Sequence, residues 1–225
     1  MTFSLVGRCK RTGMFGVAIS SSSICVGARC PHVRARAGAV ATQNVTDPTL
    51  GPLVLGYLHR GDSAGQALAK ARESSAFLEY RQVLVIDHRG HTAIHTGRSI
   101  LGTHADVAGR DCLAAGNMLK SPDVIHAMVD DFAASEGEHL AERLLHALEM
   151  GQQAGGEEGP VHSAALMVAD SQPFALVDLR IDWADEAPIA GLRRLWTDYQ
   201  PQMQAYVDRA TNPTAAPSYG VPGDE

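Results

Sequence analysis

The chain has 225 residues, 45% of them hydrophobic and 20% charged, and its 25 acidic and 19 basic residues give a formal net charge of −6. A chain of this length buries roughly 70% of its unfolded surface, which is enough for one sizeable core. Because no run of basic residues offsets the acidic balance, the composition argues against binding to nucleic acid or to a membrane surface. The four cysteines lack the C-x-x-C spacing of zinc sites and are too few for a disulfide scaffold, so we expect reduced thiols.

The first residues lack the basic and apolar regions of a signal peptide, and no stretch approaches the length of about 18 apolar residues that a membrane span needs. We therefore expect a cytoplasmic protein. The glycine fingerprints of nucleotide-binding loops are missing from the sequence, so we expect no cofactor.

In the first third of the chain, apolar or alternating runs predict strands at residues 3–6, 15–19 and 39–43, with residues 31–38 as a connection. Pro52 then opens a predicted helix that ends near Gly61. A capping box formed by Ser63 and Gln66 predicts a second helix that continues to about Tyr80. The first strands are thus followed by a helix pair.

Residues 82–87 and 92–96 are rich in β-branched side chains and flank a turn at residues 87–90, so they predict a hairpin. Ser121 as N-cap and Pro122 at the first helical position predict a third helix, and leucines from Leu140 to Leu148 mark a fourth that ends near Gly151. Strands at 163–168 and 175–181 follow, and a last helix from about Ile189 is expected to bend or break at Pro201.

Antiparallel strands grouped between helix pairs favour the α+β class, with two mainly antiparallel sheets packed face to face and helices outside them, a four-layer αββα sandwich. Residues 1–211 are expected to form this single domain. Residues 212–225 are rich in proline and small residues and are expected to be a disordered tail, because they bury too little apolar surface to offset the cost of ordering.

Three segments carry a resemblance to a known family: TFSLV at residues 2–6, GVAISSS at 16–22 and ARAGAVATQ at 35–43. Further motifs continue downstream, among them HTG at 95–97, GNML at 116–119, the glycine pair 155–156 and SAAL at 163–166. Over roughly residues 2–182 the chain resembles a bacterial family of unknown function, number 1028, placed among the N-terminal-nucleophile (Ntn) hydrolases. The resemblance implies the αββα sandwich of proteasome subunits, in which a Thr, Ser or Cys at the mature N-terminus attacks an amide.

The resemblance makes Thr2 the candidate nucleophile. A small residue such as Thr after Met1 is the usual setting for removal of the initiator, which would leave Thr2 with a free α-amine. A hydroxyl is a weak nucleophile until a base accepts its proton, and an α-amine with a pKa of about 7.7–8.0 can do so near neutral pH. Thr2 and Ser4 are expected to share one face of the first strand, and Phe3 and Leu5 the other. The alternative is that Thr2 is an ordinary strand residue in a chain that keeps Met1.

Two further catalytic residues are implied by the resemblance. Ser22, at the end of the second strand, matches a polar residue beside the nucleophile, although a solvated strand end is the competing interpretation. Arg36, with Arg34 as its competitor, matches a cation that lowers the pKa of the nucleophile by its charge, although a surface position is the competing interpretation for either residue.

The candidate substrate-binding residues are Gln43, Asn44, Asn117, His95 and Glu157. The amides could donate to the oxyanion of a tetrahedral intermediate, although a turn explains Asn44 and a capped loop explains Asn117 equally well. His95 belongs to the matching HTG motif. Glu157 follows the glycine pair in a loop that lacks the family's Arg-Gln element before Ser163. If this loop borders the active site, we expect a substrate preference that differs from the family norm.

The leading hypothesis is an amidohydrolase, acting on carbon–nitrogen bonds other than peptide bonds, that cleaves a small amide, peptide-like or cyclic-amide metabolite through an acyl-Thr2 intermediate. The alternative from another class is a non-catalytic ligand-binding or assembly protein on the same fold. A weaker possibility is metal-assisted hydrolysis at His91 and His95, but their spacing is not a zinc signature and we expect no metal. Outer helices of such a sandwich often pair, so a homo-oligomer is also plausible.

Overall fold

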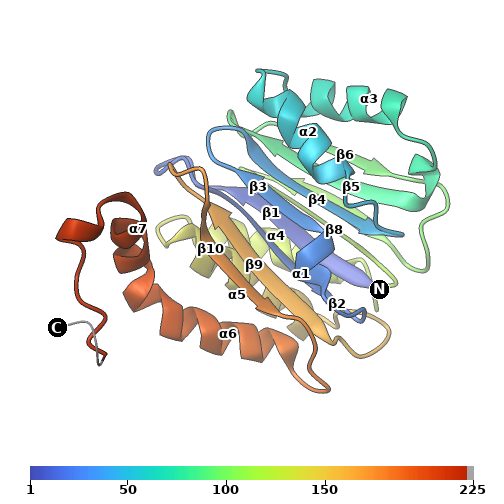
Figure 1. Cartoon of the computed structure of the whole chain (residues 1–225). Helices are drawn as coiled ribbons and strands as arrows, with labels where there is room; N and C mark the ends of the chain where they lie inside the picture. The colour runs from blue at the N-terminus through green and yellow to red at the C-terminus, as the bar shows by residue number, and fades with distance from the viewer. Residues whose placement is uncertain (222–225) are drawn as a thin grey trace.

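The computed structural model describes residues 1–221 and contains two antiparallel sheets (Figure 1). Sheet A has the strand order β10-β9-β2-β1-β8-β7, and sheet B has the order β3-β4-β5-β6. The strands of sheet A are β1 (Thr2–Arg8), β2 (Phe15–Ser21), β7 (Ala105–Gly109), β8 (Cys112–Asn117), β9 (Ser163–Ala169) and β10 (Ala175–Ile181). Those of sheet B are β3 (Pro31–Arg34), β4 (Gly38–Asn44), β5 (Arg81–Asp87) and β6 (Thr92–Thr96).

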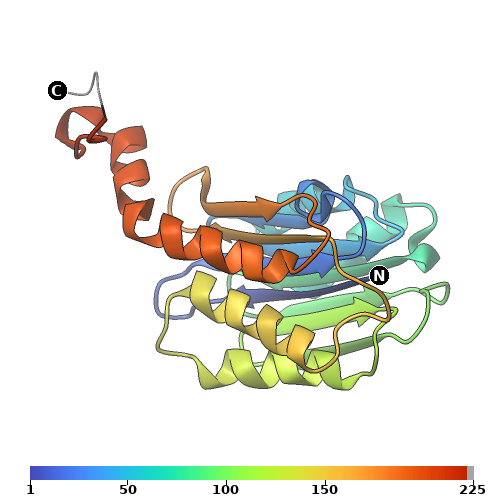
Figure 2. The same ribbon diagram turned by 90° about the horizontal axis from the view of Figure 1, so that it is seen from below.

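Helices cover the outer face of each sheet, as Figures 1 and 2 show. On sheet B they are α2 (Leu50–His59) and α3 (Ala64–Ser74), and on sheet A they are α4 (Asp123–Ala134), α5 (Leu140–Gln153) and α6 (Pro188–Tyr199). The short α1 (Val26–Arg29) follows β2, and α7 (Met203–Thr211) extends beyond α6. The predicted α+β class and sandwich arrangement are therefore confirmed. Among residues 1–221, no helix is long and apolar enough to cross a membrane.

The two faces of the central strand β1 pack in two different cores. Phe3 and Leu5 are completely buried in the core between sheet A and its helices. Val6 packs in a separate core between the two sheets, and the Ser4 hydroxyl reaches across to sheet B. This alternation follows from the two-residue period of a strand, so Thr2 and Ser4 share the inner face as the sequence predicts.

Local signals set several boundaries. The capping box at the start of α3 is present, because Ser63 Oγ accepts from the Gln66 amide and the Gln66 side chain accepts from the Ser63 amide. The helix nevertheless ends at Ser74, and residues 78–80 form a separate 3-10 turn after Phe77 adopts a φ of 63°. Pro201 lies in the 3-10 turn that separates α6 from α7, at the predicted break.

One helix start differs from its prediction. The helix α4 begins at Asp123 with Pro122 in the cap position, and Ser121 Oγ accepts from the Asp123 amide just outside the helix. The Ser121 hydroxyl therefore still accepts from an N–H of the first turn, but Ser121 lies one residue before the N-cap position that the sequence predicted for it.

Among the α-helices and strands of residues 1–221, four have no counterpart in the sequence prediction: α1, β3, β7 and β8. The connection predicted at residues 31–38 contains β3, which begins with a proline and carries a charged residue. In β8, CLAAGN consists largely of small residues that have low β-propensity, and pairing with β1 and β7 supplies the stabilisation. The strands β3 and β8 are therefore stabilised by pairing with neighbouring strands more than by the β-propensity of their own residues.

The C-terminal segment folds back on α7 as far as the structure describes it. Arg209 donates to the carbonyls of Pro217 and Ser218, and its guanidinium lies 3.7 Å from the centre of the Tyr219 ring. Residues 213–215 form a 3-10 turn. The remainder of the predicted tail, residues 222–225, lies outside the described residues.

Candidate functional site

Thr2 is the first residue of the central strand and is only 5% exposed. In the pairing register it lies opposite Ser21 of β2 on one side and Asn117 of β8 on the other. Its hydroxyl donates to the Met1 carbonyl at 2.5 Å and lies 3.1 Å from Ser21 Oγ. The Thr2 hydroxyl is thus held beside a carbonyl at a buried strand end.

A chain of hydrogen bonds leads from this carbonyl to a cation. Ser21 Oγ also donates to the Met1 carbonyl, at 2.6 Å, and lies 2.9 Å from Ser23 Oγ. Arg29 Nη2 in turn donates to Ser23 Oγ at 3.1 Å. Because the Ser21 proton is used on the carbonyl, Ser23 must donate to Ser21. Every bond therefore points from the Arg29 guanidinium toward the Met1 carbonyl oxygen.

The serine beside Thr2 is Ser21 rather than Ser22. Antiparallel pairing sets Thr2 directly opposite Ser21, and the next residue in the chain lies beyond the end of β2. Ser22 contributes its backbone amide, which donates to Glu157 Oε2 at 3.2 Å. Because residues 20–23 are all serines, the sequence alone could not show which of them faces Thr2.

Glu157 enters the site from the loop after α5 and is 3% exposed. The loop reaches this position through Gly155 and Gly156, whose φ angles of 126° and 59° favour glycine, and it makes a bridge between Leu119 and Glu157. Burial raises the Glu157 pKa to about 8, although the positive amine of Met1 acts in the opposite direction. Its Oε1 is buried and has no hydrogen-bond partner within residues 1–221.

A buried amide network lies below Thr2 between the two sheets. Ser4 Oγ donates to Gln43 Oε1 at 2.7 Å, and Gln43 Nε2 donates to Gln82 Oε1 at 2.7 Å and to the Ala115 carbonyl at 3.2 Å. Asn117 Nδ2 reaches the same Gln82 oxygen at 3.5 Å. Gln43 therefore uses its amide inside the protein and supports the site. Asn117 has its Oδ1 without a partner in the described part of the chain.

Asn44 and His95 have structural partners elsewhere. Asn44 adopts a φ of 75°, donates to the Tyr80 carbonyl and accepts from the Leu101 amide, so it ties two loops together. His95 pairs opposite Val83, whose side chain lies in the core under α2 and α3, and its Nε2 lies 3.0 Å from the Leu78 carbonyl. His95 is thus on the outer face of sheet B, away from Thr2.

The His91 imidazole lies 3.2 Å from the Asp87 carboxylate, at the far end of β5 from Gln82. Within residues 1–221, no group of three or more His, Cys, Asp or Glu side chains is arranged to hold a metal ion.

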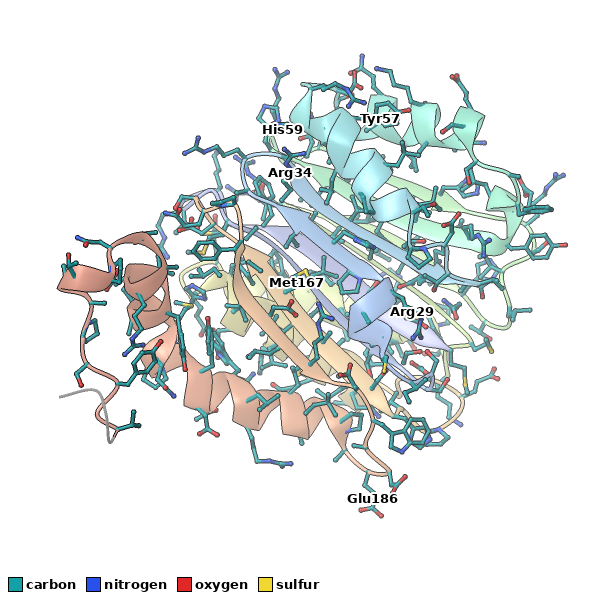
Figure 3. The ribbon with its side chains drawn as sticks, viewed as in Figure 1. Arg29, Arg34, Tyr57, His59, Met167 and Glu186 are labelled. Carbon is teal, nitrogen blue, oxygen red and sulfur yellow. The ribbon has the colours of Figure 1, made fainter. Side chains whose placement is uncertain are left out.

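Arg36 is also remote from Thr2. It lies exposed in the turn between β3 and β4 with a φ of 63°, whereas Gln43, which bonds Ser4, is at the other end of β4. Gly38 and Gln43 alone are about 16 Å apart at roughly 3.3 Å per strand residue. Figure 3 shows Arg29 toward the end of the sandwich where β1 begins and Arg34 further along. The cation linked to Thr2 through hydrogen bonds is therefore Arg29.

Sequence reasoning missed Ser21, Ser23, Arg29 and Gln82 as members of this cluster. The pairing register of the first hairpin is the signal that could have identified Ser21, since a tight turn at residues 9–14 determines which residue faces Thr2. Gln82 and Arg29 reach the site only because separate segments pack together, so local patterns could not identify them.

The comparisons with known proteins agree with this fold. The model of the "Family of unknown function (DUF1028)" matches residues 2–192. A crystal structure of a protein from Silicibacter pomeroyi with the same family model is similar, with 30% sequence identity, a TM-score of 0.82, and coverage of 88% of this chain and 89% of that chain. No curated protein matches the chain. The chain belongs to the family of unknown function DUF1028.

Proposed function

We propose that the protein is an Ntn-type amidohydrolase that cleaves the C–N bond of a small amide, peptide-like or cyclic-amide metabolite, with Thr2 as nucleophile. The observation that carries the proposal is the buried Thr2 hydroxyl at the head of the central strand, where it and Ser21 both donate to one carbonyl oxygen. Removal of Met1 releases both hydroxyls and creates an α-amine on the same residue as the nucleophile.

The reaction balances within these groups. The Thr2 amine accepts the hydroxyl proton as Oγ1 attacks the substrate carbonyl carbon, and the amine then protonates the leaving nitrogen as the C–N bond breaks. Water attacks the resulting ester, gives its proton to the same amine, and releases the carboxylic acid. Thr2 is regenerated with its hydroxyl.

Neighbouring groups suit the charges that form. The donor chain that starts at the Arg29 guanidinium ends at the Ser21 hydroxyl, so Ser21 is polarised toward an oxyanion, and the Asn117 amide lies on the other side of Thr2. In the form that keeps Met1, Glu157 is near enough to the Met1 amine for their charges to interact. In this proposal Glu157 binds a polar group of the substrate through its unpartnered oxygen.

The second candidate is a ligand-binding or assembly protein on the same fold. It is favoured by the form in which Met1 remains attached, because the Met1 carbonyl then occupies both hydroxyls and no free amine adjoins Thr2. The two candidates therefore differ in the mature N-terminal residue, which intact-mass measurement of protein from its native source determines directly.

A Thr2→Ala variant tests the chemistry. Against a panel of small amides, we expect turnover to fall by about a thousandfold or more, because no other hydroxyl shares a residue with the amine. Thr2→Ser keeps the hydroxyl and should retain measurable activity. Thr12→Ala, in the turn at the opposite end of β1, is the matched control. Undiminished turnover in Thr2→Ala, or retained Met1 in the active protein, would overturn the proposal.

A further inference from the structure

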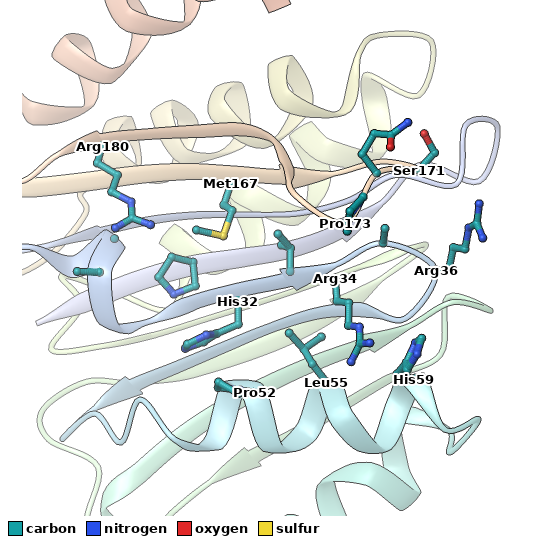
Figure 4. Close-up of a pocket in the computed structure, with 16 residues that line it drawn as sticks. His32, Arg34, Arg36, Pro52, Leu55, His59, Met167, Ser171, Pro173 and Arg180 are labelled. Carbon is teal, nitrogen blue, oxygen red and sulfur yellow. The ribbon is translucent and has the colours of Figure 1, made fainter. Parts of the chain in front are cut away.

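An open groove runs along the side of the sandwich, between α2 and the β9–β10 hairpin, with β3 along its base (Figure 4). Its volume is about 850 Å³, within the range of small-molecule sites. Neither Thr2, Ser21, Asn117 nor Glu157 lines it. The groove is therefore a second candidate site, separate from the Thr2 cluster.

One end of the groove is cationic. Arg34, Arg36 and His59 gather there (Figure 4), and none of the three side chains makes an ion pair or hydrogen bond with another of residues 1–221. The lining includes no Asp or Glu. At the other end, Arg180 is already neutralised by two bonds to the Asp178 carboxylate, at 2.7 and 2.9 Å. In a chain with a net charge of −6, uncompensated positive charge is thus concentrated at one end of a hollow.

The middle of the groove carries no charge. Pro52 and Leu55 of α2 face Met167 of β9 across it (Figure 4). His32 lies between them, and because burial lowers the pKa of its imidazole, it is neutral near pH 7. An apolar stretch therefore leads directly to the cationic end.

We propose that this groove binds a small organic anion, with a carboxylate or phosphate headgroup at Arg34, Arg36 and His59 and a short apolar body along Pro52, Leu55 and Met167. Two guanidinium groups without carboxylate partners suit either headgroup, because arginine binds both through paired N–H donors. A headgroup alone would make no contact with the apolar stretch, and an uncharged chain would form no ion pair with the arginines. This binding does not depend on the chemistry proposed for Thr2.

Calorimetric titration with four probes tests both halves of the proposal. Octanoate and octyl phosphate combine a headgroup with an apolar chain, whereas acetate has only the headgroup and octan-1-ol only the chain. We expect saturable binding of at least one of the two long-chain anions, about tenfold or more tighter than of acetate and octan-1-ol. The tighter of the two anions identifies the headgroup. Equal affinity for octan-1-ol, or no saturable binding of either anion, would overturn the proposal.

Variants locate the binding. The double variant Arg34→Gln/Arg36→Gln should weaken binding of the preferred anion about tenfold or more, and because both residues are exposed its thermal melting should match that of the unmodified protein. Arg72→Gln/Arg89→Gln, which removes two exposed arginines outside the groove, is the matched control. Met167→Gln should weaken binding of the long-chain anion but not of acetate. If the two double variants bind the anion equally well, the groove is not the site.

Discussion

The layer between the two sheets has two ends that are equally buried but chemically opposite. At one end Val6, Leu84, Ile86 and Leu113 pack in an apolar core. At the other end, inward-facing positions of β1, β4, β5 and β8 are taken by Ser4, Gln43, Gln82 and Asn117, each with no exposed surface. Because both ends lie between the same two sheets and are equally buried, the difference between them is in the side chains and not in their depth.

The polar end contributes less to stability than the apolar end. Burying apolar surface is favourable by itself, whereas a buried amide must find partners merely to recover what it loses on leaving water. At the polar end, one hydrogen-bond network replaces most of the bonds to water that these side chains lose on burial. Asn117 Oδ1 and Glu157 Oε1, however, have no partner within residues 1–221. Each buried oxygen without a partner lowers stability, because the loss of its hydration is not recovered.

The largest effect is expected at the apolar end. Leu84→Ala should lower the free energy of unfolding by about 2–5 kcal/mol, because it removes a fully buried side chain and leaves a cavity between the sheets. Chemical denaturation measures the change. Leu101→Ala, at a position that is 50% exposed, is the control and should change stability by less than about 0.5 kcal/mol. A cost for Leu84→Ala below that of the polar variant that follows would break the contrast between the two ends.

A smaller effect is expected at the polar end. Gln43→Ala should lower the free energy of unfolding by about 1–3 kcal/mol, since it leaves Ser4 Oγ and Gln82 Oε1 without their bonds to Gln43. Gln43→Met keeps the volume and removes the same bonds, so it separates the loss of hydrogen bonding from the loss of packing. If Gln43→Met is as stable as the unmodified protein, the network adds nothing to stability and its role is confined to the site.

The smallest effect concerns pH. The folded protein holds the Glu157 proton up to its pKa of about 8, whereas the unfolded chain releases it near the ordinary value of 4.5, so stability present at low pH is lost as pH rises between these values. Between about pH 7 and pH 8 this loss is about 1 kcal/mol. Glu157→Gln removes it. The variant should therefore gain stability relative to the unmodified protein over that interval, as measured by denaturation at both pH values.

If the free energy of unfolding of Glu157→Gln changes with pH in the same way as that of the unmodified protein, Glu157 is not held neutral by burial. Glu158→Gln is the matched control, because it makes the same substitution at the neighbouring position, where the side chain is exposed.

Periodic features of the chain were predictable because their causes are local. Alternation assigned Phe3 and Leu5 to one face of β1 and Thr2 and Ser4 to the other, and the Ser63–Gln66 capping box marked the start of α3. The hairpin of β5 and β6 followed from two β-branched runs around a turn. Each of these depends on residues a few positions apart, so local sequence patterns were enough to predict them.

The candidate site was decided by tertiary structure. Thr2 meets Ser21 and Asn117 through strand register, and Glu157 arrives on a loop from beyond α5. Arg36, which the sequence suggested beside Thr2, lies at the far end of β4 instead. Contacts between residues that are tens of positions apart depend on how sheets and helices pack together, and a local pattern of side chains does not contain that information.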